Sequence, residues 1–378
     1  MLRKITAVLL AAALFVCSAV TVFADGVELI SAPAGVLMEA STGKILYEKN
    51  PHDKRPCASI TKVMTLLLVF EAIDSGKLSL DDTITSSEHA ASMGGSDIWL
   101  EPGEEMSADD MIKATVVASA NDAAVALAEH ISGSEETFVA QMNQRAAQLG
   151  MEDTVFKNCN GLDEEGHITS AYDVAVMSRE LMKHEKVFDY TSIWLDNLRG
   201  GETQIVNTNK LLKTYNGITG LKTGTTDDAG CCISATATRD GMSLIGVVLG
   251  ADTGKQRFAD AAALLDYGFA NYSVKELKVP EDLPAELPVE GGMDKTAPIS
   301  CEIHANAVVN KASDDEAHAE ISLPESLQAP LEEGEKVGSV VYKIGEDTKS
   351  FDIFSVNAIP AASFPLVFQK VFNSLITL

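Results

Sequence analysis

A serine and a lysine stand three residues apart in the motif Ser59-Ile60-Thr61-Lys62. Residues at this spacing share one face of a helix, so the Lys62 amine can reach the Ser59 hydroxyl. A serine hydroxyl is a weak nucleophile until a neighbouring base takes its proton. Lysine can act as that base only when burial and a second nearby cation lower its pKa toward neutrality. The motif therefore indicates covalent catalysis by an activated serine, provided that its helix is buried.

Two further motifs carry groups that suit a peptide. Ser119-Ala120-Asn121 supplies a hydroxyl that can relay a proton and an amide that can bind a peptide group. Lys222-Thr223-Gly224 places a cation and a hydroxyl on an expected strand, where Gly224 leaves room for an extended ligand and the cation suits a carboxylate. Residues 41–44 and 355–357 repeat the first two patterns in an expected turn and strand, so only the ordered set of three is specific.

The helices that must position these motifs follow from hydrophobic patterning. Residues 59–75 are apolar almost all round and end before Gly76, which predicts a buried helix. Helical patterns also cover residues 108–131, with the second motif inside, as well as residues 135–149 and 171–184. Alternating residues predict one hairpin over 36–48 and a second over 231–250, the latter around Asp240-Gly241. The sheet is expected to combine strands from both ends of this segment.

The chain divides into a main domain over residues 25–275 and smaller parts around it. A segment rich in proline and glutamate follows, and short alternating runs then predict a separate β domain over residues 276–358. Residues 1–24 resemble a secretory signal cleaved after Ala24, with a retained signal anchor as the alternative; either way the rest of the chain is exported.

Residues 359–378 contain an amphipathic helix pattern from Pro365 onward. Such a helix would extend about 20 Å, too short for a hydrocarbon core of about 30 Å. It is expected to lie in the membrane interface, and docking on its own domain is the alternative. An acidic body is repelled by anionic lipid, so anchoring must come from buried apolar surface.

Composition excludes several classes of function. The 378 residues carry 29 Lys and Arg against 55 Asp and Glu, a net charge of −26, and 46% of them are hydrophobic. This apolar content excludes global disorder, and an acidic chain without a basic cluster is not expected to bind nucleic acid. The five cysteines after the signal show no regular spacing and the histidines no ligand pattern, so neither a disulfide framework nor a zinc site is expected.

The three motifs together form the set found in penicillin-binding proteins and class A β-lactamases. Their surroundings, such as Asn160-Gly161-Leu162 and Gly220-Leu221-Lys222, resemble the low-molecular-mass penicillin-binding proteins, the D-alanyl-D-alanine carboxypeptidases, over roughly residues 30–275. The resemblance implies an α+β fold. A transpeptidase/β-lactamase-like domain, in which helices flank an antiparallel sheet beside a helical subdomain, would be followed by a small all-β domain and a C-terminal amphipathic helix.

The resemblance also implies roles for the motif residues. Ser59 would be the acylated nucleophile, Lys62 its base, and Ser119 the shuttle that carries a proton to the departing D-alanine. The backbone N–H groups of Ser59 and Thr225 would form the oxyanion hole, worth about 3 to 4 kcal/mol per donor. Asn121 would bind the substrate backbone, while Lys222 and Thr223 would hold the terminal carboxylate or tune Lys62. The implied binding positions are thus Asn121, Lys222, Thr223, Gly224 and Thr225.

The implied enzyme is a serine-type D-Ala-D-Ala carboxypeptidase that trims peptidoglycan stem peptides through an acyl-enzyme, without metal or nucleotide. β-Lactams would be its covalent inhibitors, and it would be held peripherally at the outer face of the cytoplasmic membrane. A β-lactamase is one alternative, but its glutamate-bearing loop is not recognisable over residues 153–165. A non-catalytic wall-binding or drug-sensing protein is the other, and the intact motifs weigh against it.

Three further residues bear on the motifs. Cys57 stands where a small apolar residue would be more usual, and a thiol reagent should inhibit acylation if its sulfur borders the cleft. Thr225 follows Lys-Thr-Gly where some members of the family have histidine. Arg257 is expected to be a solvated surface arginine, with a contribution to carboxylate recognition as the alternative.

Overall fold

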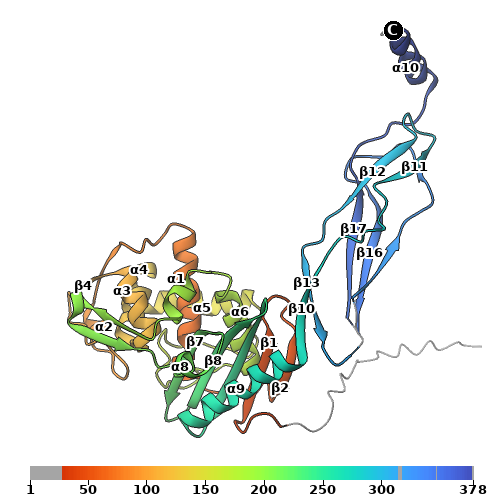
Figure 1. Ribbon diagram of the computed structural model, residues 1–378. Coiled ribbons are helices and arrows are strands. Elements are labelled where there is room, and N and C mark those ends of the chain that lie inside the picture. Colours follow the sequence, from red (N-terminus) through yellow and green to blue (C-terminus); the bar gives the residue numbers. More distant parts are fainter. Residues whose placement is uncertain (1–27, 314–316, 346, 377–378) are drawn as a thin grey trace, which may run out of the picture.

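The computed structural model describes residues 28–313, 317–345 and 347–376, and the expected signal peptide lies outside the described residues. Figure 1 shows a large body of sheet and helices, a slender body of strands, and the terminal helix α10 (Phe364–Ile376) beyond it. This arrangement is the α+β architecture expected from the sequence.

A five-stranded antiparallel sheet forms the centre of the large body. Its strands follow the order β2 (Ile45–Lys49), β1 (Ala34–Glu39), β9 (Met242–Ala251), β8 (Gly230–Arg239) and β7 (Ile218–Thr226). Both expected hairpins are present, and Asp240 and Gly241 join β8 to β9 with φ angles of 50° and 77°, which suit a two-residue turn. Strand β7, which carries Lys222-Thr223-Gly224, lies at one edge of the sheet.

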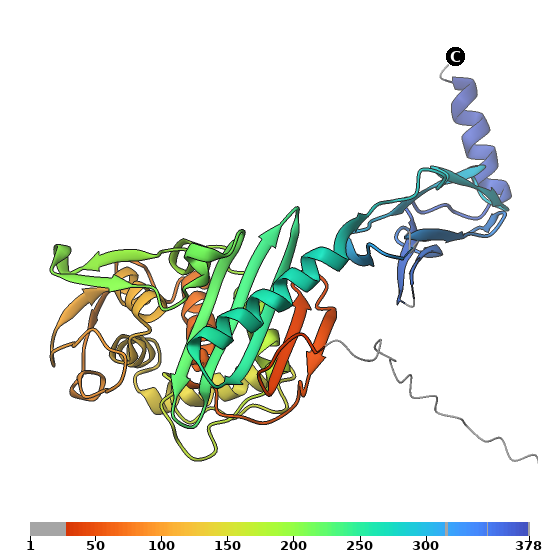
Figure 2. The same ribbon diagram turned by 60° about the horizontal axis from the view of Figure 1, so that its bottom comes forward.

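Helices cover both faces of the sheet because successive strand residues point to opposite sides. Val36 and Met38 of β1 belong to the core shared with α1 (Lys62–Asp74) and α6 (Ala171–Leu181). Leu37, between them, packs with α9 (Gly254–Asn271), which crosses the other face in Figure 2. The expected buried helix is therefore α1, and it ends before Gly76.

A helical subdomain adjoins α1. It contains β3 (Thr83–Thr85), α2 (Glu88–Ala91), β4 (Glu105–Ser107), α3 (Ala108–Lys113), the π-helical turn η2 (Ala114–Ala118), α4 (Asn121–Ser132) and α5 (Glu135–Gln148). Three short pieces lie between α6 and β7: α7 (Val187–Thr191), the hairpin of β5 (Leu195–Leu198) and β6 (Thr203–Val206), and α8 (Leu211–Thr214).

The continuous helix expected over residues 108–131 is wrong. After the π-helical turn, Ser119 adopts the left-handed region (φ 62°), and Ala120 is extended before α4 begins. The break is satisfied by tertiary partners, since the Asn121 N–H donates to the Ser96 carbonyl at 2.7 Å. A hydrophobic pattern reports which face is buried and contains no signal for this interruption.

The slender body consists of strands around its own apolar core, with Ala297, Val340 and Ile353 at its centre. Strand β10 (Tyr272–Leu277) pairs with β13 (Ala305–Asn310). A six-stranded sheet follows in the order β14 (His318–Ser322), β16 (Lys336–Ile344), β17 (Asp347–Ser355), β12 (Thr296–Cys301), β11 (Glu286–Glu290) and β15 (Leu327–Gln328). Within the described part of the chain, no helix is both long and apolar enough to span a bilayer.

Candidate active site

Ser59 lies in the 3-10 turn η1 (Ala58–Thr61) that leads into α1. A loop and a strand pack closely against the backbone of this turn. A Cβ atom at Gly161 would lie 2.0 Å from the Ala58 carbonyl oxygen, and one at Gly224 would lie 2.8 Å from the Ser59 nitrogen. Only glycine permits approaches this close. The turn is therefore held between the loop at residues 158–162 and strand β7.

The Lys62 amine has three acceptors around it. Its Nζ atom donates to Ser59 Oγ at 3.0 Å, to Asn121 Oδ1 at 2.5 Å and to the Asn160 carbonyl at 2.7 Å. The side chain is fully buried, and this desolvation lowers the pKa of Lys62 to about 7, although nearby Cys159, Asp122 and Cys57 act in the opposite direction.

This set of acceptors suits both protonation states of the amine. The ammonium form has three N–H donors, one for each acceptor. After loss of a proton, two N–H bonds can stay on Asn121 Oδ1 and the Asn160 carbonyl, which leaves the lone pair directed at Ser59 Oγ. The geometry can therefore activate the serine without rearrangement.

Lys222 forms the other side of the site. Its Nζ atom donates to Ser119 Oγ at 2.8 Å and to the Thr223 carbonyl at 2.9 Å. Burial lowers the pKa of Lys222 well below its usual range, and the positive charges of Lys62 and Arg257 lower it further. The Lys62 charge thus lowers the pKa of Lys222, whereas burial is what lowers the pKa of Lys62 itself. Of the two conditions for a basic lysine, burial is the one that the structure meets.

The structure brings the three motifs together at one place. Hydrogen bonds connect Ser59, Lys62 and Asn121 as one group and Lys222, Ser119 and Thr223 as a second. Ser119 and Asn121 are two residues apart in the chain, and the helix break at the left-handed Ser119 gives each of them a different lysine as its partner. Gly224 lies against the Ser59 turn, and Thr225 follows it with an exposed side chain. The two decoys lie elsewhere: Lys44 pairs with Asp347 of the strand body at 2.5 Å, and Ser355 ends β17.

Family models match two parts of the chain. Residues 21–253 match the model described as D-alanyl-D-alanine carboxypeptidase, and residues 272–368 match the penicillin-binding protein 5 C-terminal domain. The chain belongs to the D-alanyl-D-alanine carboxypeptidase family. This membership confirms the enzyme class implied by the motifs, a serine-type D-alanyl-D-alanine carboxypeptidase of the low-molecular-mass penicillin-binding protein group.

Individual relatives support the same family membership. The chain is 43% identical over 316 residues to D-alanyl-D-alanine carboxypeptidase DacF of Bacillus subtilis (strain 168), covering 82% of this chain and 81% of the relative. Penicillin-binding protein 5 from Haemophilus influenzae has a TM-score of 0.77 at 31% identity, over 88% of this chain and 98% of that one. Penicillin-binding protein D2 from Listeria monocytogenes, solved in its ampicillin-bound form, has a TM-score of 0.59 at 34% identity, over 65% and 100%. The expected fold class is confirmed.

In this carboxypeptidase Arg257 is not a solvated surface residue, and that expectation is wrong. The side chain is only 8% exposed. Its NH1 atom donates to the Gly224 carbonyl and to Thr225 Oγ1, both at 3.0 Å, and to the Cys232 carbonyl at 3.3 Å. Helix α9 packs against the sheet and carries the guanidinium behind β7, so Arg257 supports the Lys-Thr-Gly strand.

The burial of Cys57 decides whether a thiol reagent can reach its sulfur. It is fully buried, with Sγ 3.4 Å from Thr61 Oγ1, and burial raises the pKa of its thiol to about 11. A buried, protonated thiol is inert toward alkylating reagents. The sulfur does not border the cleft, so the condition for inhibition by a thiol reagent is not met.

Two buried groups behind the nucleophile were missed by the sequence analysis. His167 Nδ1 accepts the Lys157 N–H at 3.2 Å, so Nε2 of the neutral ring donates to Thr61 Oγ1 at 2.7 Å. Thr61 Oγ1 in turn donates to the Ala58 carbonyl at 2.9 Å. Burial lowers the pKa of His167 to about 4, which keeps the ring neutral. A single histidine remote from every motif offered no sequence signal for this support.

Proposed function

We propose that this carboxypeptidase removes the terminal D-alanine from peptidoglycan stem peptides through an ester on Ser59. The contact that carries the proposal is Lys62 Nζ to Ser59 Oγ at 3.0 Å, made by a wholly buried amine with a pKa of about 7. A base with this pKa is half deprotonated at neutral pH and still strong enough to take a proton in the transition state.

The reaction then has two steps, acylation of Ser59 and hydrolysis of the resulting ester. Lys62 takes the Ser59 proton while Oγ attacks the carbonyl carbon of the penultimate D-alanine, and the backbone N–H groups of Ser59 and Thr225 stabilise the oxyanion. The peptide bond breaks as Ser119 passes a proton to the leaving amine, and Ser119 recovers one from the lysine pair. Water then hydrolyses the ester, which returns the proton to Ser59 and releases the shortened peptide.

The proposed binding roles take account of the hydrogen bonds that the motif side chains already make. Both Lys222 and Asn121 are engaged within the protein, since Asn121 Nδ2 donates to the Gly94 carbonyl at 2.7 Å. We assign these two residues to holding the lysine pair, and a substrate contact by Asn121 would require its amide to leave Gly94. The Thr225 and Thr223 hydroxyls would receive the terminal carboxylate, and Thr225 is exposed. To donate to the substrate, Thr225 Oγ1 would leave the Gly224 carbonyl, at 2.8 Å, and Thr223 Oγ1 would leave Thr208 Oγ1, at 2.7 Å.

The same serine is proposed to react with penicillin, as the ampicillin-bound relative suggests. Labelled penicillin should add one stable mass to a peptide containing Ser59, and a D-Ala-D-Ala peptide should release free D-alanine. Ser59→Ala should lose both reactions and keep its melting temperature. Rapid loss of the label would identify a β-lactamase, and stable labelling without D-alanine release would identify a sensor.

We further propose that the chain comprises a catalytic domain over residues 25–275, a β domain over 276–358, and a membrane-associating segment over 359–378. Helix α10 supports the last part, because its exposed Phe364, Phe368 and Phe372 stack in a row with ring centroids 6.2 Å apart. Such an apolar ridge suits the interface of the outer face of the cytoplasmic membrane after export.

Vesicle binding tests this peripheral placement. The protein lacking residues 1–24 should sediment with phosphatidylcholine vesicles, because the attraction is apolar rather than ionic. Replacing Phe368 and Phe372 with serine should abolish sedimentation while leaving penicillin labelling intact. Equal sedimentation of the two forms, or none by either, would refute the assignment.

A further inference from the structure

The Asn160 carbonyl, one of the two groups that orient the Lys62 amine, belongs to a loop without regular secondary structure. The loop, residues 158–162, is fastened partly by its own side chains. Asn158 Oδ1 accepts the Gly161 N–H at 2.7 Å, and Asn160 Oδ1 accepts the Leu162 N–H at 3.0 Å. These bonds shape the loop locally, but they do not attach it to the rest of the protein.

Attachment comes through Cys159, the residue before Asn160. Its carbonyl accepts a hydrogen bond from Thr65 Oγ1 of α1 at 2.5 Å, and its N–H donates to Glu135 Oε1 at 3.0 Å. Thr65 and Glu135 therefore hold both polar groups of one peptide residue from two different helices. Because these two hydrogen bonds hold the Cys159 backbone, they also set the direction of the next carbonyl, that of Asn160.

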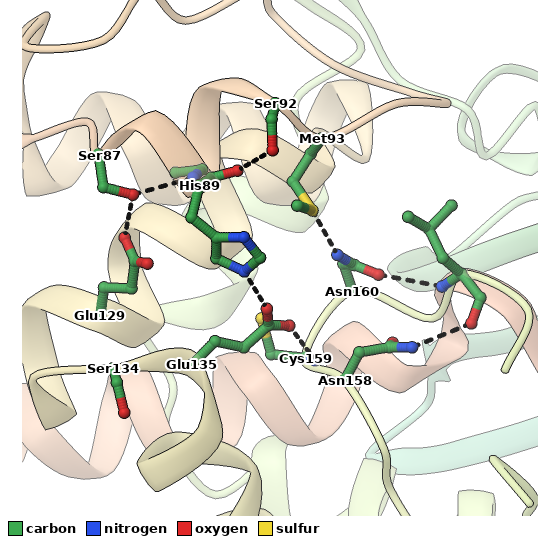
Figure 3. A network of polar contacts seen from close by, with 12 residues as sticks. Ser87, His89, Ser92, Met93, Glu129, Ser134, Glu135, Asn158, Cys159 and Asn160 are labelled. Carbon is green, nitrogen blue, oxygen red and sulfur yellow. Dashed lines mark hydrogen bonds and ion pairs between the residues drawn. The ribbon is translucent and has the colours of Figure 1, made fainter.

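The Glu135 carboxylate is itself held by a histidine on the solvent side. Its Oε2 atom lies 2.7 Å from His89 Nε2, and Figure 3 shows the carboxylate between the imidazole and the Cys159 backbone. The Glu135 side chain is 15% exposed, whereas His89 is 51% exposed. The buried Cys159 thiol also faces this carboxylate, and burial with the carboxylate charge keeps the thiol pKa raised. Glu135 thus connects α2, the start of α5 and the loop.

A second contact joins the same segments. Asn160 Nδ2 donates to the sulfur of Met93, just after α2, at 3.4 Å. The residues that follow Met93 hold the other orienting group, because the Gly94 carbonyl accepts from Asn121 Nδ2. The segment from His89 to Gly94 therefore contacts the groups that hold the Asn160 carbonyl and Asn121 Oδ1, the two acceptors that direct the Lys62 lone pair.

We propose that Glu135 is a positioning residue for acylation: clamped by His89, it fixes the Cys159 N–H and thereby keeps the Asn160 carbonyl on the Lys62 amine. The proposal rests on the proposed function, since it gives Lys62 the role of base. Without Glu135 the loop keeps its internal bonds and its contacts with Thr65 and Met93, but the Cys159 N–H loses its acceptor. The Lys62 lone pair then spends less time directed at Ser59 Oγ, while the substrate-binding face of β7 is unchanged.

Three variants of α5 test this role. Glu135→Ala removes the acceptor, Glu135→Gln keeps an oxygen for the Cys159 N–H, and Glu136→Ala removes an exposed carboxylate from the same helical turn. A small displacement of a catalytic group costs up to about 100-fold in rate. Glu135→Ala should therefore slow acylation by penicillin about 10- to 100-fold, with the dissociation constant of the preceding non-covalent complex unchanged. Glu135→Gln and Glu136→Ala should stay within about threefold of wild type.

The pH profile separates positioning from general damage. An ammonium that loses an acceptor is less stable, so the acid limb of the acylation profile should move to lower pH in Glu135→Ala. The profile of Glu136→Ala should match wild type. The charged and titratable groups around this amine are Lys222, Asp122, Cys57 and Cys159, and both variants retain all four residues. Loss of the Glu135 charge lets the pKa of the Cys159 thiol fall, and a thiolate there would raise the pKa of Lys62, so a limb that moves to higher pH would contradict the positioning role.

Several results would overturn the inference. It fails if Glu135→Ala acylates as fast as Glu136→Ala, if Glu135→Gln is as slow as Glu135→Ala, or if only the dissociation constant changes. Should Glu135→Ala not fold, His89→Ala decides instead: it removes the exposed clamp and should slow acylation severalfold, and an unchanged rate would refute the role. A wild-type protein that is never acylated would sink the proposed function itself, which keeps the two failures distinct.

Discussion

Replacing Lys62 with methionine is expected to slow acylation of Ser59 by about 10²- to 10⁴-fold, the usual contribution of a positioned general base. Methionine fills a similar volume and brings no charge into a wholly buried position, so the fold should survive. The acylation rate with labelled penicillin, measured beside the melting temperature, provides the test. A folded variant that reacts at the wild-type rate would remove Lys62 from the mechanism.

The pH dependence of the wild type provides the matching control. Since only the free amine accepts a proton, and the pKa of Lys62 is about 7, acylation should rise with pH through that value and level off above it. Below the pKa, each unit of pH should cost about tenfold in rate. In Lys62→Met this limb should disappear. A wild-type limb near 10 would show that burial does not lower the lysine pKa.

Gly161→Ala is expected to damage both activity and stability. The new Cβ atom would lie 2.0 Å from the Ala58 carbonyl oxygen and 2.9 Å from the Ser59 nitrogen, so the nucleophile turn must move. The residue also has a φ of 87°, which disfavours any side chain. Together, conformational strain and overpacking should destabilise the fold by about 2 to 5 kcal/mol. Displacement of Ser59 should slow acylation by about 100-fold or more.

Gly150→Ala is the matched control. Gly150 has a similar φ of 72°, but a Cβ atom there would meet nothing within 4 Å. It should lose only about 1 to 2 kcal/mol, and its acylation rate should not change. Urea unfolding and penicillin labelling of both variants separate the effect of backbone strain at a positive φ from the effect of the steric clash with the Ser59 turn. Equal effects of the two substitutions would show that the close approach at Gly161 does not matter.

The pairing of nucleophile and base was predictable because it is local. Ser59 and Lys62 are one helical turn apart, and any helix over this segment brings them near each other, as the 3.0 Å contact shows. The hairpin around Asp240-Gly241 was predictable for the same reason, since a two-residue turn is specified by its own residues. The family resemblance added an expected role for each motif residue.

The hydrophobic pattern failed to predict the local structure where hydrogen bonds from distant residues override a local preference for helix. Residues 108–131 look like one helix, yet the chain leaves the helix at Ser119 because Ser96 and neighbouring groups replace the lost backbone bonds. This interruption places Ser119 Oγ 2.8 Å from an amine 103 residues further along the chain. A pattern read over a short stretch of sequence cannot include both residues of that contact.

By itself, the sequence determined which reactive groups this enzyme has, which of them are neighbours along a helix, and the strands and helices whose patterns are local. The tertiary structure alone decided the environment of those groups: the burial that brings Lys62 toward neutrality, the place of Arg257 behind β7, and the support of the Asn160 carbonyl by Glu135. The physical reason is that desolvation and orientation depend on atoms contributed by remote segments. A residue type specifies what a side chain can do, and only its packed neighbours set its pKa and its direction.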